Sequence, residues 1–278
     1  MKQPGWGLAG ALLVAAPVFA GVAYAIAGAA GLAGPGAAGL TGAHFGEVLA
    51  SGAVWRGVWW STRAALLSTT LAAAIAVAVA VLFRGAAGVD RLARALAVVP
   101  LPVPHIVAAS CGVLVLGQSG LLARLGFALG FVATPQDVPA LVSDPLGIGF
   151  VLTLAWKEFP FLALVAASLL HTRGAELEEV ARTLGSRGWE TFRRVTWPTL
   201  WRGLLPAAVA VFIFVAGSYE AAFVLAPSDP LPLPALTYER YLDIDLARRG
   251  DAYVLALIGL AMGAAAVVAH EWARGRDG

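Results

Sequence analysis

The chain has 278 residues, of which 59% are hydrophobic and 13% charged, and its mean hydropathy is +0.80. This apolar share is larger than a soluble core uses and indicates a membrane protein. The net charge of +2 gives no indication of a nucleic-acid partner, and a single cysteine, Cys111, excludes an intrachain disulfide and a thiolate metal cluster. The length suits one all-α domain of five or six spans of about 20 residues each, without a large soluble domain.

The first two predicted spans are uncharged. One covers about Trp6 to Ala30, where a cleaved signal peptide is the alternative, although the run is long for one and more spans follow. The loop after it contains His44, which we expect to be a solvated loop residue. The second span lies between Arg63 and Arg84 and is preceded by three tryptophans typical of a membrane interface, at positions 55, 59 and 60.

A third apolar run ends near Gly117 and is interrupted by prolines at positions 100, 102 and 104. Prolines this dense break a helix, and broken backbone at membrane depth persists only against protein or a watery cavity. We therefore expect this run, with His105, to line a pathway or a dimer contact. His105 is either a substrate contact or a hydrogen-bonded structural histidine. Cys111 is expected to be a small buried residue.

Residues 118–145 are predicted to form an external loop with a partly helical hairpin. A re-entrant segment would keep the topology, whereas a complete crossing would reverse every later span. The fourth span, about Leu146 to Leu170, contains Lys157 and Glu158 near its middle. Adjacent charges are costly there, and side chains about 100° apart on a helix need different partners.

Residues 176–198 form a polar segment between two apolar runs. Four apolar residues recur at helical spacing and predict one apolar stripe that needs a partner surface: Leu177, Val180, Ala181 and Leu184. Gly185 falls where a left-handed residue would end this helix. A second short helix, about Arg187 to Val195, is expected next, and Pro198 then suits the first turn of the following span.

The spacing within this segment resembles the EAA signature of permease subunits of binding-protein-dependent ABC importers, in which Glu-Ala-Ala is followed by Gly, Ile and Leu-Pro at fixed intervals. The matching positions are Glu179-Val180-Ala181, Gly185, Val195 and Trp197-Pro198, with Phe192 at an often aromatic position. The departures at Val180, Val195 and Trp197 replace apolar residues with apolar residues. The alternative is an amphipathic linker on the membrane surface.

The fifth span is predicted from about Thr199 to Leu225, with Glu220 near its far end, and the sixth from about Ala252 to Ala269. Between them lies a proline-rich loop with a short amphipathic piece around Tyr238 to Leu246. With the N-terminus inside, twelve basic residues are cytoplasmic and five external, as the positive-inside rule expects. The external set is Arg56, Arg124, Arg240, Arg248 and Arg249.

The resemblance implies the type I importer permease fold, all-α and polytopic, in the bacterial inner membrane with both termini cytoplasmic. It implies that the chain is not an enzyme and has no cofactor of its own, because ATP and Mg²⁺ are bound by partner ATPase subunits. The other implied partners are a second permease chain, identical or homologous, an external substrate-binding protein and the lipid bilayer. The residues implied in coupling to the ATPase are Glu178, Glu179, Ala181, Gly185, Phe192 and Pro198.

The stretch around Lys157 and the proline-rich loop look most like permeases of thiamine-type importers, within a wider group that handles polyamines and ferric iron. Possible pathway residues are His105, Lys157, Glu158 and Glu220. A proton-coupled secondary transporter would use the last three as a relay, but the chain shows no convincing inverted repeat. A membrane enzyme is not favoured, because the four histidines have no metal-ligand spacing.

Overall fold

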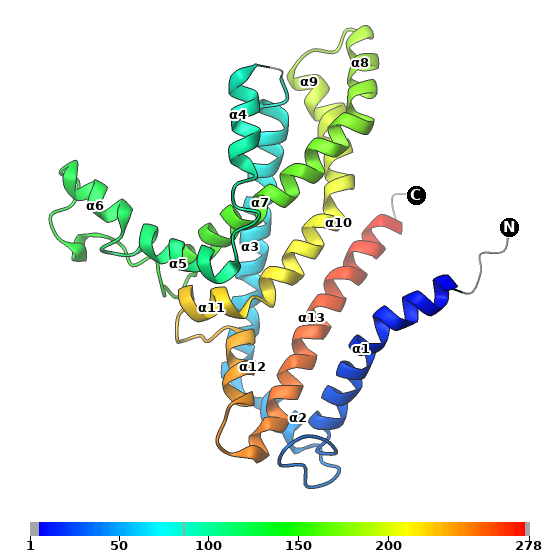
Figure 1. The fold of residues 1–278 in the computed structure, drawn as a ribbon, viewed down its shortest axis with the longest axis vertical. Helices are drawn as coiled ribbons and strands as arrows, with labels where there is room; N and C mark the ends of the chain where they lie inside the picture. Colours follow the sequence, from blue (N-terminus) through cyan, green and yellow to red (C-terminus); the bar gives the residue numbers. More distant parts are fainter. Residues whose placement is uncertain (1–5, 86, 276–278) are drawn as a thin grey trace. The chain divides into compact units, whose positions relative to one another are not determined.

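The computed structural model describes residues 6–85 and 87–275, and in this part of the chain the regular structure is helical, without strands (Figure 1). Six helical stretches are long and apolar enough to cross a membrane, which confirms the predicted all-α polytopic fold. They are Gly10–Ala29, Gly52–Leu82, His105–Ala128, Ile148–Thr172, Trp189–Ala216 and Leu246–Gly275.

The chain divides into two compact units. The first lies within Met1–Trp59 and Leu231–Ala264, and the second within Trp60–Pro230 and Ala265–Gly278. The helices α3 (Gly52–Leu82) and α13 (Arg249–Gly275) each contribute residues to both units. The prediction that the chain is a single transmembrane domain stays a prediction.

The first unit contains α1 (Trp6–Ala29), α2 (Ala43–Ala50), α12 (Leu233–Tyr241) and the short η4 (Leu246–Arg248), with the adjoining parts of α3 and α13. Its apolar core includes Val48, Leu233 and Val254. His44, expected to be solvated in a loop, instead lies in α2, where its Nδ1 atom is 2.9 Å from Oδ1 of Asp251. The amphipathic piece expected around Tyr238 to Leu246 begins earlier, because the prolines at its start open α12 rather than interrupt it.

The second unit contains the two polar sites described below, one around Glu178 and one around His105. Its remaining elements follow in chain order: α4 (Gly88–Ala97), α5 (His105–Leu116), α6 (Leu121–Ala128), η1 (Pro135–Asp137), α7 (Ile148–Leu169), η2 (Leu170–Gly174), α8 (Ala175–Thr183), α9 (Trp189–Thr191), η3 (Phe192–Thr196), α10 (Trp197–Ala216) and α11 (Tyr219–Leu225). The helix α7 packs against α5 and α10, and α11 packs against α5. The helices α4, α8 and α9 gather at one end of α7 and α10 (Figure 1).

Several predicted boundaries are wrong. The helix α3 begins at Gly52, so the three tryptophans lie within it, and Trp60 is buried with its indole N–H donating to the Pro145 carbonyl at 2.9 Å. The third apolar run becomes helical only at His105, because the proline-containing turn separates α4 from α5. The helix α5 then ends at Leu116, next to the expected end near Gly117, although the candidate span continues through α6 to Ala128. Cys111, expected to be buried, is exposed on α5.

The fifth apolar run is not one helix. The helix α10 ends at Ala216, and α11 starts at Tyr219 after a break at Gly217 and Ser218. Glu220 therefore lies on a separate short helix. The segment 118–145 holds the eight-residue α6, which at about 1.5 Å per residue is too short to cross a membrane alone.

Candidate functional site

The helix α8 ends in a Schellman motif. Gly185 has a φ of +89°, the Ser186 N–H donates to the Ala181 carbonyl at 3.0 Å, and the Gly185 N–H donates to the Arg182 carbonyl at 3.0 Å. A Cβ atom at Gly185 would meet nothing within 4 Å, so a side chain there is opposed by backbone strain alone. The sequence-based end of this helix is confirmed.

The apolar stripe of α8 is exposed. Leu177 is 50% exposed, Val180 56% and Leu184 83%, whereas Ala181 is half-buried. Exposed large apolar side chains in a row mark a contact surface. This face is therefore open to a partner, and Glu179 lies exposed beside it.

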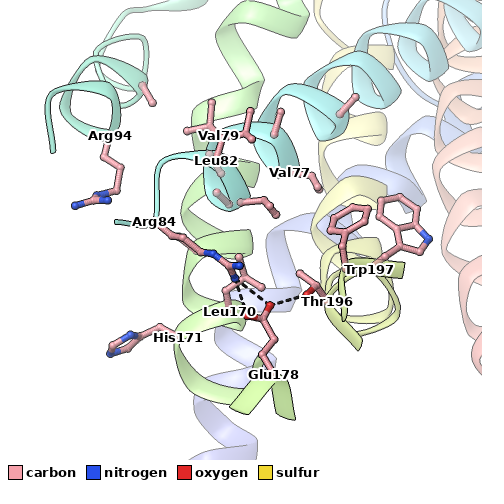
Figure 2. A pocket seen from close by; sticks show the side chains of 18 of the residues that line it. Val77, Val79, Leu82, Arg84, Arg94, Leu170, His171, Glu178, Thr196 and Trp197 are labelled. Atoms are coloured by element: carbon pink, nitrogen blue, oxygen red, sulfur yellow. Dashed lines mark hydrogen bonds and ion pairs between the residues drawn. The ribbon is translucent and has the colours of Figure 1, made fainter. Parts of the chain in front are cut away.

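The carboxylate of Glu178 turns the other way. Nη1 of Arg84, at the end of α3, lies 2.9 and 2.8 Å from its two oxygens, and the Thr196 hydroxyl donates to Oε1 at 2.5 Å. Figure 2 shows this carboxylate between Arg84 and Thr196. The resemblance implies that Glu178 belongs with residues that face an ATPase, but its side chain is directed inward and is buried by these partners. Its part in coupling stays a prediction.

Electrostatics favours the charged form of Glu178. Burial raises the pKa of this carboxyl, but the hydrogen bonds from Thr196 and Arg84, together with the charges of Arg84 and Arg182, outweigh burial and hold the pKa below its ordinary value. Glu178 is therefore an anion at neutral pH, and Arg84 is its nearest cation.

The segment after Gly185 differs from the prediction. The short helix expected from Arg187 to Val195 is not separate, since α9 continues through the wide turn η3 into α10. Pro198 lies in the first turn of α10, as predicted. Proline lacks an N–H and its ring crowds the carbonyl four residues earlier, so a wide turn before it relieves the clash. Phe192 stacks on Trp189 with ring centroids 5.2 Å apart.

An open pocket of about 1380 Å³ lies beside this segment. Its apolar walls come from α3, the end of α4, α7 and the aromatic residues of α9 to α10, and its polar lining includes Arg84, Glu178 and Thr196 (Figure 2). The side chain of His171 points away from Glu178 (Figure 2). Movement of α8 would therefore reshape a space that α3, α4, α7 and the α9 to α10 segment also line.

A second polar site lies within the candidate spans. Nε2 of His105 is 2.8 Å from Oε1 of Glu158, and the ammonium of Lys157 donates to the Leu101 carbonyl at 3.3 Å. The two adjacent charges have different partners, as their angular separation on a helix predicts. Leu101 lies in the turn before α5, next to Pro102. Prolines have no N–H to donate to a nearby carbonyl, so the Leu101 carbonyl is available to Lys157.

Glu220 and His105 line one pocket of about 550 Å³ with Phe214, Gly217 and Ser218. Ser218 is buried, and its hydroxyl has no hydrogen-bond partner among the described residues. The structure thus pairs His105 with Glu158 and places His105 and Glu220 on one pocket, while Lys157 has a separate partner. Sequence reasoning missed Ser218, although the Gly-Ser pair is a known cause of helix breaks.

In residues 6–85 and 87–275 the histidines and acidic residues show no metal-binding arrangement. Among the described residues, no group of three or more His, Cys, Asp or Glu side chains could hold a metal ion. Both sites instead consist of ion pairs and single hydrogen bonds.

The fold and these two sites define a polytopic membrane protein with a kinked, polar interior and an amphipathic helix outside the spans. Residues 74–274 match the family model described as "Binding-protein-dependent transport system inner membrane component". This match covers more than half of the chain. The chain therefore belongs to this family, the membrane-spanning permease subunits of binding-protein-dependent ABC importers.

Curated relatives and solved structures agree with this assignment. The molybdenum transport system permease protein ModB of Mycobacterium tuberculosis is 30% identical over 215 residues, 77% of each chain. The sulfate transport system permease protein CysW of the cyanobacterium Synechocystis is 29% identical over 165 residues, which cover 58% of this chain and little more than half, 56%, of that relative.

A bacterial ABC transporter for the acidic polysaccharide alginate matches with a TM-score of 0.75 over 98% of this chain and 96% of that one, at 15% identity. At this identity the likeness shows the fold.

Proposed function

We propose that the chain forms half of a substrate pathway in the inner membrane and couples it to ATP hydrolysis by a partner ATPase. The observation that carries the proposal is the exposed apolar stripe of α8, ended at Gly185 within the EAA-like segment. A groove on an ATPase subunit would cover Leu177, Val180 and Leu184, and Glu179 would act at the polar edge of this contact.

The proposed complex contains two permease chains, two ATPase subunits that bind ATP and Mg²⁺, and an external binding protein. The excess of basic residues on one side supports a cytoplasmic location for both termini and for α8. Substrate selection then rests mainly on the binding protein, and this chain provides passage rather than tight binding.

We propose a tetrahedral oxyanion such as molybdate or sulfate as the substrate. The names of the relatives support this class, and none of those described above supports the thiamine, polyamine or ferric iron suggested by local sequence similarity. The lining of the smaller pocket is compatible with brief passage of an anion. Glu158 contacts His105 and is not among the residues that line this pocket, and the Ser218 hydroxyl is available as a donor, whereas the exposed Glu220 opposes long residence of an anion.

The proposal is tested by co-purifying the chain with its ATPase and measuring uptake in cells that lack and then regain the complex. Restored uptake of radiolabelled molybdate or sulfate, with thiamine, spermidine and ferric iron unchanged, supports the oxyanion assignment. Restored uptake of one of the other three solutes would contradict it. Uptake driven by a proton gradient in vesicles that contain this chain without an ATPase would favour the secondary-transporter alternative, with Lys157, Glu158 and Glu220 as the relay.

A further inference from the structure

Three segments of the second unit meet at the Glu178 carboxylate. Arg84 brings the end of α3, Thr196 brings the wide turn that leads into α10, and Glu178 itself belongs to α8 (Figure 2). Each contact is short, and two of the three bonds join charged groups, which form the stronger hydrogen bonds. The arrangement fixes the position of α8 against both neighbouring helices.

The Arg84 side of this junction is itself held in place. Arg94, on α4, donates to the carbonyl oxygens of Phe83 and Gly85, the latter at 2.9 Å. A cation at the last carbonyls of α3 also suits the negative end of its helix dipole. The hydrogen bonds from Arg94 therefore hold the backbone on both sides of Arg84 in place. A displacement of Glu178 would pull on this held backbone through the Arg84 side chain.

Burial separates Glu178 from its neighbour on the helix. The side chain of Glu178 is 5% exposed, while that of Arg84 is 51% exposed and Glu179 is exposed on the outer side. A buried ion pair is weak evidence for stability, since apolar residues of the same volume often stabilise as well. The pair instead specifies the relative position of the three segments, because each hydrogen bond holds particular atoms of these segments next to one another.

We propose that Glu178 is the positioning residue that carries displacement of α8 to α3 and α10. The inference rests on the proposed function, in which an ATPase moves α8. When α8 shifts, its buried carboxylate draws Arg84 and Thr196 with it. Because α10 also carries Ile213 and Phe214 at the smaller pocket, the shift reaches the pathway through this helix.

The test uses the complete complex with its ATPase in lipid nanodiscs. In a background with Cys111→Ser, Ile213→Cys reports on the pathway through its rate of reaction with a hydrophilic maleimide, without and with ATP plus vanadate. With Glu178, Arg84 and Thr196 unaltered, we expect ATP plus vanadate to change this rate by at least about fivefold, the lower end of the range for coupling between two sites. Glu178→Gln should keep assembly of the complex but reduce the change in rate, because a neutral amide keeps only part of the carboxylate's hydrogen bonding.

Matched variants separate positioning from a general effect of charge. Glu190 is also paired with an arginine, Arg194 at 3.4 Å, but its carboxylate is exposed. Glu190→Gln should therefore keep the ATP-dependent change in labelling rate. Arg84→Gln leaves the buried carboxylate of Glu178 without its nearest cation, which destabilises the fold. The double variant Arg84→Gln/Glu178→Gln avoids this and should lose no more response than Glu178→Gln alone, because both changes remove one interaction.

Each outcome decides a point. A full response in Glu178→Gln, or a further loss in the double variant, would overturn the positioning role. Loss of the response together with a lower melting temperature of the complex would also overturn it, since Glu178 would then be needed for stability alone. If the unaltered chain neither binds the ATPase nor responds to ATP, the proposed function fails, and that result is distinct from failure of this inference.

Discussion

His105 and Glu158 join α5 to α7 through a contact of 2.8 Å between Nε2 and Oε1, although they are 53 positions apart in the chain. The ring of His105 also lies 4.6 Å from the ring of Phe214 on α10, measured between centroids. His105 on α5 thus contacts both α7 and α10, and it does so next to Glu158, the carboxylate within the span formed by α7. An ionisable group at this depth needs such a partner.

Replacement of Glu158 tests what this pair does. Glu158→Ala leaves the His105 ring without its partner, and a largely buried hydrogen-bonding group left unsatisfied costs about 1–3 kcal/mol, so the purified protein should unfold at a lower temperature. Glu158→Gln keeps a hydrogen-bonding atom near His105 and should unfold close to the unaltered chain. Cys111→Ser, on the exposed side of α5, is the control and should change neither. If Glu158→Gln also transports at an unchanged rate, the pair has a structural role alone.

Gly185→Val tests the helix end. A β-branched residue at a φ of +89° costs at least about 1–2 kcal/mol, and the chain would leave α8 at another angle. Transport and ATP hydrolysis stimulated by the loaded binding protein should both collapse, with membrane insertion intact. Gly46→Ala in α2 is the control, because a Cβ atom meets nothing there and φ is ordinary. Wild-type transport by Gly185→Val would show that the angle is unimportant.

The lowered pKa of Glu178 predicts how the junction responds to acid. Because the pKa of Glu178 is lower in the folded state, the ion pair contributes its full stability at pH values above the ordinary carboxyl pKa. This stability is lost only as the pH falls through the lowered pKa of the folded state. A spin label at Leu184 should keep the same mobility from pH 8 to about pH 5, still above the ordinary carboxyl pKa. In Glu178→Gln the mobility should be higher throughout this range. A mobility that rises between pH 8 and pH 5 in the unaltered chain would contradict the assigned pKa direction.

Sequence patterns were sufficient for the number of spans and for the end of α8. Run length fixes which segments can cross a bilayer, and Gly185 is a local signal that depends on few neighbours. Boundaries were less accurate. The tryptophans before Arg63 belong to α3, because Trp60 finds a carbonyl partner in the loop before α7 that no local pattern reveals.

The inward direction of Glu178 could not be predicted. Helical periodicity assigns the apolar stripe to the packing face, yet here the stripe is exposed and a carboxylate packs inside. The partner of Glu178, Arg84, is 94 positions away, so nothing near Glu178 signals the pairing. The break at Gly217 was hidden in the same way, since the apolar run continues through it to Leu225.

Topology is tested by labelling from outside in intact cells. In the Cys111→Ser background, a cysteine at Ser228 should react with an impermeant maleimide and one at Ser186 should not, because we place residues 176–198 in the cytoplasm. The opposite pattern would invert the topology and exclude the proposed ATPase contact. Reaction at Ser186 after permeabilisation controls for simple burial of that position.

Photo-crosslinking from Leu184 tests the proposed coupling surface most directly. A photoreactive phenylalanine analogue at this most exposed position of the stripe should join the chain to the ATPase subunit in membranes, and Glu179→Lys should weaken the product. The same analogue at Leu125, an apolar position on α6 that is 50% exposed, should give no ATPase product. A strong ATPase adduct from Leu184 with none from Leu125 is the predicted result; no adduct from Leu184 in an assembled, transporting complex would contradict the coupling role of α8.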